Sequence, residues 1–404
     1  MCIGIIRAIA SLLGLALTAA VAPALADKKY GPGVTDSEIK IGQTMPYSGP
    51  ASAYGTLGKA QAAYFEKINA EGGVNGRKIR LLSLDDGYSP PRTAEQVRKL
   101  VEEDEVLLLF HTNGTAPNTA IQKYLNAKKV PHLFVASGAA KWNDPRNFPW
   151  TMGWQPNFQT EAAAYAKFII QQKPDAKIGV LYQNDDLGKD YLKGLRDGLG
   201  EKAAQMIVAE ASYEVTDPTI DSQIITLQAS GADVFIDVTT PRFGAQAVRK
   251  VYDLGWRPSH ILAFPSSSVA AVLTPAGLDK SVGLISVAFV KDPTDVQWRN
   301  DTATQEYRAW MRKYYPDGNE ADILNTYGYV AAQTLVQVLK QCGDELTREN
   351  VMKQAGNLHD LALPMLLPGI RINTSPTDFR PIKQMQLMRF DGRQWVRFGE
   401  LVGQ

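Results

Sequence analysis

Histidine is scarce in this chain, and its scarcity limits the catalytic chemistry that the sequence can support. The four histidines are His111, His132, His260 and His359. None lies at a spacing from a carboxylate or a thiol that indicates a catalytic dyad or a metal site. The serine-nucleophile motif G-x-S-x-G is absent, since Ser137-Gly138 lacks the preceding glycine. The sequence therefore predicts no catalytic residues, no metal site and no enzyme activity.

Phosphate-binding motifs are absent as well. Neither G-x-x-x-x-G-K-[ST] nor G-x-G-x-x-G occurs, so we expect no nucleotide and no other cofactor. Two acidic pairs, Asp85-Asp86 and Asp185-Asp186, follow predicted strands. We interpret both pairs as solvated loop carboxylates or helix N-caps rather than as acid/base catalysts.

What remains is a series of polar and aromatic residues at predicted strand ends, where open α/β sheets bind ligands. The series comprises Tyr47-Ser48-Gly49, Tyr54, Thr112 to Thr115, Ala136-Ser137-Gly138, Gln183 to Leu187, Thr239-Thr240 and Ser266-Ser267-Ser268. In FHTNGTAPNTAIQ, residues 110–122, a helix start follows a buried strand, and backbone N–H groups at such a start favour a negative group. The same residues are also typical of a simple helix cap, so the pattern alone leaves both interpretations open.

The elements that position these residues alternate along two successive stretches of the chain. Apolar periodicity predicts strands over 38–44, 78–84, 106–110 and 132–136, with helices over 55–70, 92–103 and 116–127. The alternation restarts after residue 154 and continues to residue 264, followed by a long helix over 321–341 and a hairpin over 384–398. Strand-helix-strand crossovers of this length predict parallel sheets, so we expect an α/β protein with two sheets that clamp a ligand between them.

The amino-terminal segment predicts that this protein is exported. Residues 1–26 have one arginine, an apolar stretch and the cleavage pattern Ala24-Leu25-Ala26, which predicts a signal peptide and a mature chain that begins at Asp27. The net charge of +1 and the lack of a basic run argue against a nucleic-acid partner. The mature chain keeps one cysteine, Cys342, and its roughly 380 residues favour two domains.

Three motifs in order along residues 47–90 add a family resemblance. They are S-G-P-x-x-x-x-G, I-N-A-x-G-G-[VI]-x-G and D-D-x-x-x-P, and together they resemble the amino-terminal signature of branched-chain amino-acid type (Leu/Ile/Val-binding protein-like) solute-binding proteins of ABC importers. The resemblance runs over essentially the whole mature chain. It implies a type I periplasmic binding protein fold with two doubly wound parallel-sheet lobes, three crossover segments and a ligand enclosed by hinge closure.

The resemblance also implies domain bounds and partners. Lobe 1 would comprise 27–151 plus 288–366, and lobe 2 would comprise 152–287 plus 367–404, with FPWTMGW (148–154) as a hinge. It further implies a periplasmic monomer that delivers a small carboxylate-bearing ligand to an inner-membrane ABC permease.

Binding positions carried over from the family give a candidate site. Thr112 and Asn113 fall on the carboxylate-binding loop, and Ala136 and Gly138 on the next strand end, where Ser137 would have to supply the hydroxyl that Gly138 lacks. The full candidate set is Tyr54, Thr112, Asn113, Ala136, Ser137, Gly138, Leu187, Thr239 (or Thr240), Ser266 and Ser267.

One departure from the family bears on the ligand. Ser266 or Ser267 stands where amino-acid binders carry the acid that holds the α-ammonium, and a buried ammonium without a carboxylate partner costs several kcal/mol. We therefore expect an organic or aromatic acid whose apolar body is covered by Tyr54, Phe110, Phe243 or Trp154. Asp185, Asp186 or Asp237 could replace the missing acid, so branched-chain or other hydrophobic amino acids and amides stay open. An exported α/β enzyme or a ligand sensor is a further, less favoured alternative.

Overall fold

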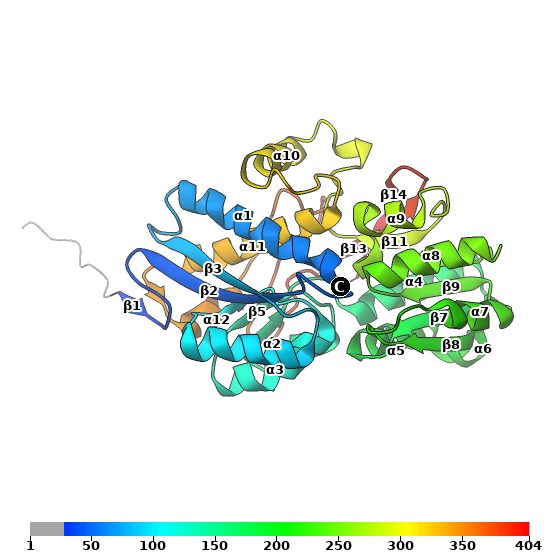
Figure 1. Cartoon of the computed structure of the whole chain (residues 1–404), viewed down its shortest axis with the longest axis horizontal. Coiled ribbons are helices and arrows are strands. Elements are labelled where there is room, and N and C mark those ends of the chain that lie inside the picture. Colours follow the sequence, from blue (N-terminus) through cyan, green and yellow to red (C-terminus); the bar gives the residue numbers. More distant parts are fainter. Residues whose placement is uncertain (1–27, 404) are drawn as a thin grey trace, which may run out of the picture.

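The computed structural model describes residues 28–403, and these residues form two lobes that are each built on their own sheet. Figure 1 shows the first lobe, with its blue, cyan and orange elements, beside the second lobe, which is largely green. The predicted signal peptide, residues 1–26, lies outside the described residues. Among residues 28–403, no helix is both long and apolar enough to cross a bilayer.

The sheet of the first lobe has five parallel strands in the order β3-β2-β4-β5-β6. The strands are β2 (Glu38–Met45), β3 (Lys78–Asp85), β4 (Leu109–Phe110), β5 (His132–Val135) and β6 (Thr151–Gly153). All residues of the run 106–110 are fully buried. Such a continuous apolar run is needed where helices cover both faces of a parallel sheet.

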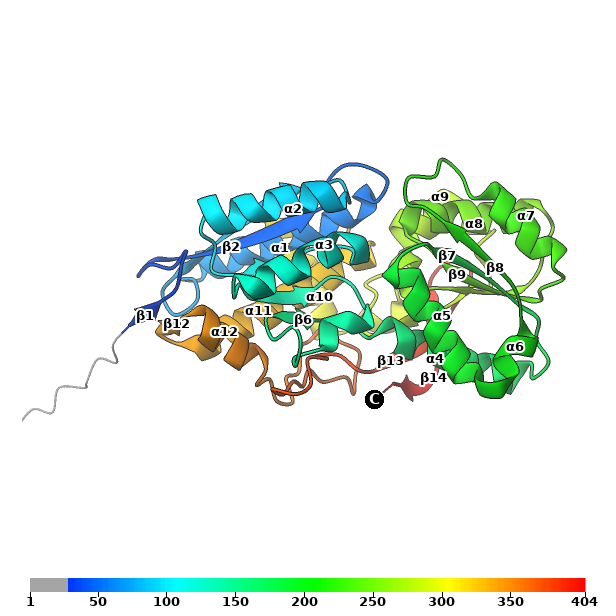
Figure 2. The same cartoon turned by 90° about the horizontal axis from the view of Figure 1, so that it is seen from below.

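The described part of the first lobe has six α-helices, and three of them come from the second half of the chain (Figures 1 and 2). They are α1 (Gly55–Ala70), α2 (Pro90–Arg98, continued by a π-helical turn to Glu103), α3 (Thr115–Ala127), α10 (Thr302–Tyr314), α11 (Ile323–Cys342) and α12 (Arg348–Ala355). Helix α11 packs closely against α1, since a Cβ at Gly328 would lie 2.9 Å from the Leu57 carbonyl oxygen. A short pair, β1 (Lys29–Tyr30) with β12 (Glu345–Leu346), closes the end of this lobe.

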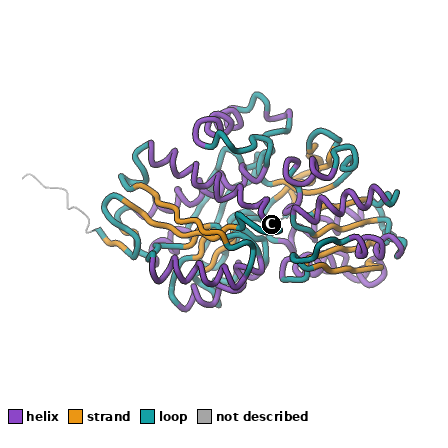
Figure 3. Tube along the Cα trace, in the orientation of Figure 1, coloured by secondary structure: helices purple, strands orange, loops and turns teal. Residues whose placement is uncertain are grey.

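The second lobe has a seven-stranded sheet in the order β14-β13-β11-β10-β9-β7-β8. The parallel strands are β7 (Ile178–Gln183), β8 (Ile207–Tyr213), β9 (Val234–Val238), β10 (Ser259–Leu262) and β11 (Ile285–Ala288). The predicted closing hairpin, β13 (Met385–Phe390) with β14 (Trp395–Val402), joins β11 in antiparallel fashion. Helices on both faces complete the lobe (Figure 3): α4 (Phe158–Gln172), α5 (Asp186–Leu199), α6 (Ala203–Met206), α7 (Asp221–Ala229), α8 (Pro241–Asp253) and α9 (Thr274–Ala276).

The chain passes between the lobes three times, as predicted: after β6, after β11 and before β13. The sheets end slightly beyond the predicted boundaries. Met152 and Gly153 belong to β6 and hence to the first sheet, although both were expected in lobe 2. Ala288 pairs with Gln386 in the second sheet, although it was expected in lobe 1. The second half of the predicted hinge, FPWTMGW, is thus largely a strand, because Thr151 and Gly153 pair with β5.

Candidate functional site

A cavity lies between the two lobes, at the carboxyl ends of their central strands. The space not filled by protein atoms, with the part open to solvent included, is about 430 Å³. Both lobes contribute to its lining: Tyr54, Leu57, Tyr88, Asn113, Gly114, Thr115, Ala136, Ser137, Gln155, Phe158, Leu187, Phe264, Pro265, Leu324 and Tyr327. No Lys, Arg, His, Asp or Glu is among these lining residues, so the wall of the cavity carries no formal charge.

Five of the predicted site residues line this cavity. They are Tyr54, Asn113, Ala136, Ser137 and Leu187. The loop after β4 is held against the loop after β5, because the Gly114 N–H donates to the Ala136 carbonyl (3.2 Å) and the Ala136 N–H donates to the Thr112 carbonyl (3.0 Å). The ends of two neighbouring parallel strands are thereby brought together, as expected of a ligand site in an open α/β sheet.

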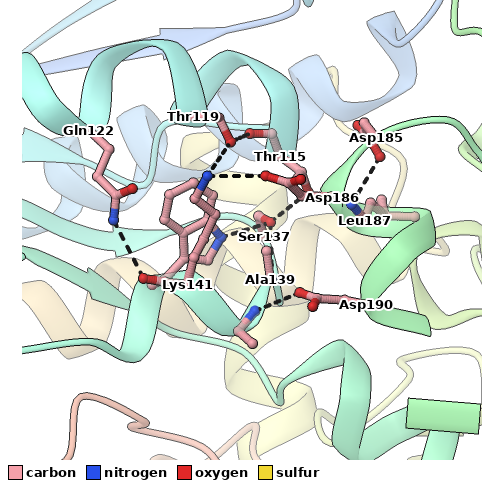
Figure 4. A network of polar contacts seen from close by, with 12 residues as sticks. Thr115, Thr119, Gln122, Ser137, Ala139, Lys141, Asp185, Asp186, Leu187 and Asp190 are labelled. Atoms are coloured by element: carbon pink, nitrogen blue, oxygen red, sulfur yellow. Dashed lines mark hydrogen bonds and ion pairs between the residues drawn. The ribbon is translucent and has the colours of Figure 1, made fainter. Parts of the chain in front are cut away.

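Ser137 and Thr115 form a directed chain of hydrogen bonds at this edge (Figure 4). The Ser137 Oγ accepts the Trp142 indole N–H (2.9 Å) and the Ala139 backbone N–H (3.3 Å). A hydroxyl has two acceptor lone pairs and one donor, so Ser137 must donate its proton to the Thr115 Oγ1 at 2.8 Å. The Thr115 hydroxyl is then free to donate into the cavity.

Asn113 supplies a second polar group. Its side-chain oxygen is buried without a hydrogen-bond partner, while its backbone N–H donates to the Thr44 carbonyl (3.3 Å). Rotation of the amide by 180° exchanges the oxygen for the NH₂ group, so Asn113 can meet either an acceptor or a donor on a ligand.

Thr112, by contrast, faces away from the cavity. Its hydroxyl bonds to the Asn118 side-chain oxygen and to His132 Nε2 (2.7 Å), beneath the start of α3. Burial lowers the pKa of His132 to about 3, so this histidine is neutral and helps fix the loop from below. The candidate carboxylate contact at Thr112 is therefore a structural hydrogen bond in this arrangement.

Gly138 does not line the cavity either. Its lack of a side chain makes room for a close contact between the lobes. A Cβ at this position would come within 2.6 Å of the Pro156 carbonyl oxygen and 2.7 Å of the Phe158 ring. The Gly138 carbonyl accepts the Phe158 N–H (2.8 Å), so the missing side chain lets the second lobe's first helix approach. Phe158 in turn lines the cavity.

The remaining second-lobe candidates are buried beside the cavity without lining it. Thr239 donates to Asp237 Oδ1 (2.6 Å), and the Ser266 hydroxyl donates to the Thr239 carbonyl (2.5 Å). The neighbouring Thr240 is likewise buried and does not line the cavity. The Ser267 carbonyl accepts the Trp395 indole N–H (2.9 Å).

The three candidate replacement acids also have partners. Asp185 caps α5 through the N–H groups of Leu187 and Gly188, Asp186 pairs with Lys141 at 3.0 Å, and Asp237 pairs with His260 at 3.1 Å. The interpretation of Asp185 as a helix N-cap is confirmed. Asp86, however, is fully buried, so a solvated carboxylate was the wrong expectation there.

Aromatic side chains form the apolar wall, and the sequence pointed to only one of them. Tyr54 donates across the lobes to the Pro265 carbonyl (3.1 Å). The Tyr327 hydroxyl donates to Gln155 Oε1 (2.5 Å), and Tyr88 and Phe264 complete the wall. Phe110, Phe243 and Trp154 are core residues that do not line the cavity. A signal for Tyr327 existed in its three-residue spacing from Leu324 on one face of the long helix.

Polar contacts join the lobes at the rim of the cavity. Lys141, from the first lobe, lies between Thr119 (3.2 Å) and Asp186 of α5 (Figure 4). The neighbouring Ala140 N–H donates to Asp190 of the same helix (2.7 Å). These bonds and the Tyr54 contact hold the lobes together around the cavity.

Comparisons with known proteins agree with this geometry. The Leu/Ile/Val-binding protein homolog 1 of Brucella abortus is 26% identical over 358 residues, which span 85% of this chain and 87% of that protein. A branched chain amino acid ABC transporter structure from Thermus thermophilus with bound valine superposes with a TM-score of 0.82 at 16% identity, over 92% of this chain and 98% of the other. A fatty acid ABC transporter substrate-binding protein from Thermomonospora curvata gives 0.78 at 20% identity, over 93% and 95%.

The fold of these structures is the type I periplasmic binding protein fold that the resemblance implied, so that prediction is confirmed. The family model described as periplasmic binding protein matches residues 38–394, which is most of the chain and includes both lobes and the cavity between them. This protein therefore belongs to the periplasmic binding protein family.

Proposed function

We propose that this protein is an exported binding component that captures a small organic acid with an apolar body between its lobes. In this proposal the signal peptide directs the chain to the periplasm, and the loaded monomer delivers the acid to an ABC permease in the inner membrane. The observation that carries the choice of an acid is the hydrogen-bond chain from Trp142 through Ser137 to Thr115, which ends in a donor facing the cavity.

A carboxylate suits this edge of the cavity. Hydrogen bonds to a charged acceptor contribute about 1.5 to 3 kcal/mol each, and the Thr115 hydroxyl and the Asn113 amide can both donate. Both residues lie at the amino terminus of α3, a helix of 13 residues, where the helix dipole favours a negative group by about 0.3 to 1 kcal/mol. These neutral donors support binding of an anion without a cation in the wall.

An ammonium group has no comparable partner. No carboxylate is among the lining residues, and Asp185, Asp186 and Asp237 already bond to other groups. Burial of an unpaired ammonium costs several kcal/mol, which is a large part of the roughly 8 kcal/mol that a micromolar ligand gains. Apolar and aromatic side chains form most of the remaining wall, and they suit an alkyl or aryl body.

A branched-chain amino acid is the second candidate. The names of the Brucella relatives and the valine in the Thermus structure favour it, while the fatty acid protein from Thermomonospora favours the acid. The two candidates differ in whether removal of the α-ammonium improves binding. Isovalerate and leucine-sized acids without the amino group should therefore bind more tightly than valine and leucine.

A thermal-shift screen tests the proposal. The panel contains straight-chain carboxylates, benzoate, valine, leucine and the amides that match each acid. A ligand at about 100 times its Kd adds roughly 2.7 kcal/mol of stability, which gives a measurable rise in Tm. No rise with any carboxylate would contradict the choice of an acid, and a rise with valine alone would favour the second candidate.

Thr115→Val together with Ser137→Ala tests the role of the hydrogen-bond chain from Ser137 to Thr115. Loss of the donor chain should weaken acid binding by about 10- to 100-fold, since a charge-assisted hydrogen bond contributes about 1.5 to 3 kcal/mol. Thr226→Val is the matched control, because Thr226 is an exposed helical threonine in the second lobe. Unchanged acid affinity in the double variant would place the carboxylate elsewhere.

A further inference from the structure

Gln155 brings an amide group to the cavity from the first crossover between the lobes. It follows β6, precedes α4 and lines the cavity. The chain on either side is fixed, since Trp154 is fully buried and the Pro156 carbonyl oxygen would lie 2.6 Å from a Cβ at Gly138. A residue before proline is also restricted largely to extended backbone. The backbone of Gln155 is therefore held in one place, beside the loop after β5.

Tyr327 determines which end of this amide is left for other partners. The Tyr327 hydroxyl donates to Gln155 Oε1 (2.5 Å) and makes no other hydrogen bond within residues 28–403. Burial raises the pKa of Tyr327, so the hydroxyl keeps its proton. With the amide reversed, the NH₂ group would face the hydroxyl, and a buried donor would lose its acceptor. Oε1 therefore stays on Tyr327, and the NH₂ group points away from it.

The ring of Tyr327 cannot follow a rotation of the amide, because other rings surround it. Its centroid lies 4.9 Å from that of Trp154, 5.1 Å from that of His111 and 5.9 Å from that of Phe289. The side chain is 3% exposed. The hydroxyl is thus a fixed donor, and the orientation of the Gln155 amide is part of the fold.

The NH₂ group of Gln155 is the unused donor in this part of the cavity. No hydrogen bond joins it to another group within residues 28–403. Among the other lining residues away from the start of α3, the Tyr54 hydroxyl donates to the Pro265 carbonyl and the Tyr327 hydroxyl donates to Gln155. Two N–H bonds therefore remain for an oxygen on a ligand.

The charge of the wall indicates which kind of oxygen fits. A second carboxylate would have one neutral amide as its partner and no cation in the lining. Burial of a charge without adequate partners is unfavourable, whereas an uncharged carbonyl oxygen needs only a donor. The amide of Gln155 therefore suits a keto oxygen.

We propose that Gln155 binds a keto oxygen on the body of the ligand, so that the preferred ligand is an oxo acid rather than an unsubstituted acid. This inference rests on the proposed function, because it assumes that the carboxylate lies at the start of α3. Strand β5 lies between β4 and β6, so Asn113 and Gln155 stand on opposite sides of the loop after β5. Several carbon atoms therefore separate the keto group from the carboxylate.

Matched ligands and two variants test this proposal. The ligands are heptanoate, its 4-, 5- and 6-oxo derivatives, and the primary amides of all four acids, each titrated by calorimetry at pH 8. Gln155→Met removes the donors. Gln155→Glu also removes them but keeps an acceptor for the Tyr327 hydroxyl, which protects the fold. Gln171→Met is the matched control, because Gln171 is an exposed glutamine near the far end of α4.

The measured quantity is the ratio of the Kd of an oxo acid to the Kd of heptanoate, because any effect of a variant on all acids cancels in this ratio. For the unaltered protein we expect at least one oxo acid to bind as tightly as heptanoate or more tightly. Both Gln155 variants should raise the ratio for that acid about tenfold, since its buried carbonyl loses its partner. Gln171→Met should leave it unchanged.

Two results would overturn the proposal. One is weaker binding of every oxo acid than of heptanoate by the unaltered protein. The other is an unchanged ratio in either folded variant, which would mean that Gln155 contacts the carboxylate or no part of the ligand. If Gln155→Met does not fold, Gln155→Glu alone decides.

The amides separate this proposal from the choice of an acid. If amides bind and acids do not, the acid is wrong, and the ratio within the amide series still tests Gln155. If heptanoate binds and no oxo compound does, the acid stands and the role of Gln155 is wrong. Binding of no compound in either series overturns both.

Discussion

Glu161 is a buried carboxyl group directly behind the cavity wall, and its protonation should make stability depend on pH. Its side chain accepts the Phe264 backbone N–H (2.8 Å) and the Tyr165 hydroxyl (2.9 Å), and the residue is 2% exposed. Burial raises the pKa of Glu161 from 4.5 to about 7, against the opposing effect of these hydrogen bonds. Since Phe264 lines the cavity, this carboxyl also helps to hold the ligand site in place.

The sign of the effect follows from the two pKa values. Below about pH 4.5 the carboxyl is protonated in both the folded and the unfolded chain, and the contribution to stability is complete. Between pH 4.5 and 7 the unfolded chain loses the proton while the folded chain keeps it, so stability falls as pH rises. Each pH unit over this range lowers the free energy of unfolding by about 1.4 kcal/mol. Glu161 therefore contributes about 3 kcal/mol of stability at low pH, and this contribution is lost above pH 7.

Glu161→Gln should remove this dependence. The amide keeps an oxygen for the Phe264 N–H, and its NH₂ can donate to the neighbouring Tyr191 hydroxyl. Urea unfolding of both proteins at a series of pH values from 4 to 8.5 measures the difference. Between pH 4 and 8.5, we expect the free energy of unfolding of the unaltered protein to fall by about 3 kcal/mol relative to that of the variant. Parallel stability profiles across the whole range would refute the argument.

Three further predictions concern an ion pair between the lobes, the packing of two helices in the second lobe, and Cys342. Lys141→Met should weaken ligand binding about two- to threefold at low salt and less at high salt, because the Lys141–Asp186 pair is 31% and 42% exposed; calorimetry at two ionic strengths measures this. Gly194→Ala should cost about 1 to 3 kcal/mol in urea unfolding, since a Cβ there would overlap the Gln159 backbone of α4; an unchanged midpoint would contradict it. In protein lacking residues 1–26, Cys342 should react with a thiol reagent only after unfolding, because it is buried and burial raises its pKa to about 12; reaction in buffer without urea would disprove this.

Local patterns predicted the elements well where packing and propensity agree. The bounds of α1 (Gly55–Ala70) match the expected range, and the long helix and the hairpin lie where they were expected. Helices α10 and α12 were missed. Both sequences are mostly polar, and each helix buries four residues against nine in α1, so fewer apolar positions marked them in the sequence.

The neighbourhood of the site could be predicted from strand ends, but the direction of each side chain could not. Thr112 and Asn113 are consecutive, and in extended backbone consecutive side chains point to opposite sides. Asn113 faces the cavity, whereas Thr112 faces His132. Leu324 and Tyr327 come from α11, which reaches the cavity only after the chain has returned to the first lobe, so no strand end indicated them.

The hydroxyl groups of Ser137 and Thr115 show why residue types alone do not determine which ligand a site prefers. Ser137 and Thr115 together could offer a ligand either a donor or an acceptor. The choice is made by Trp142 and Ala139, whose N–H groups occupy both lone pairs of the Ser137 oxygen and force its proton toward Thr115. Neither residue lines the cavity, and their contacts exist only once the loop after β5 has folded back on itself. Preference for an acceptor ligand therefore arises from residues behind the wall, and Trp142→Phe should weaken it while the wall itself stays unchanged.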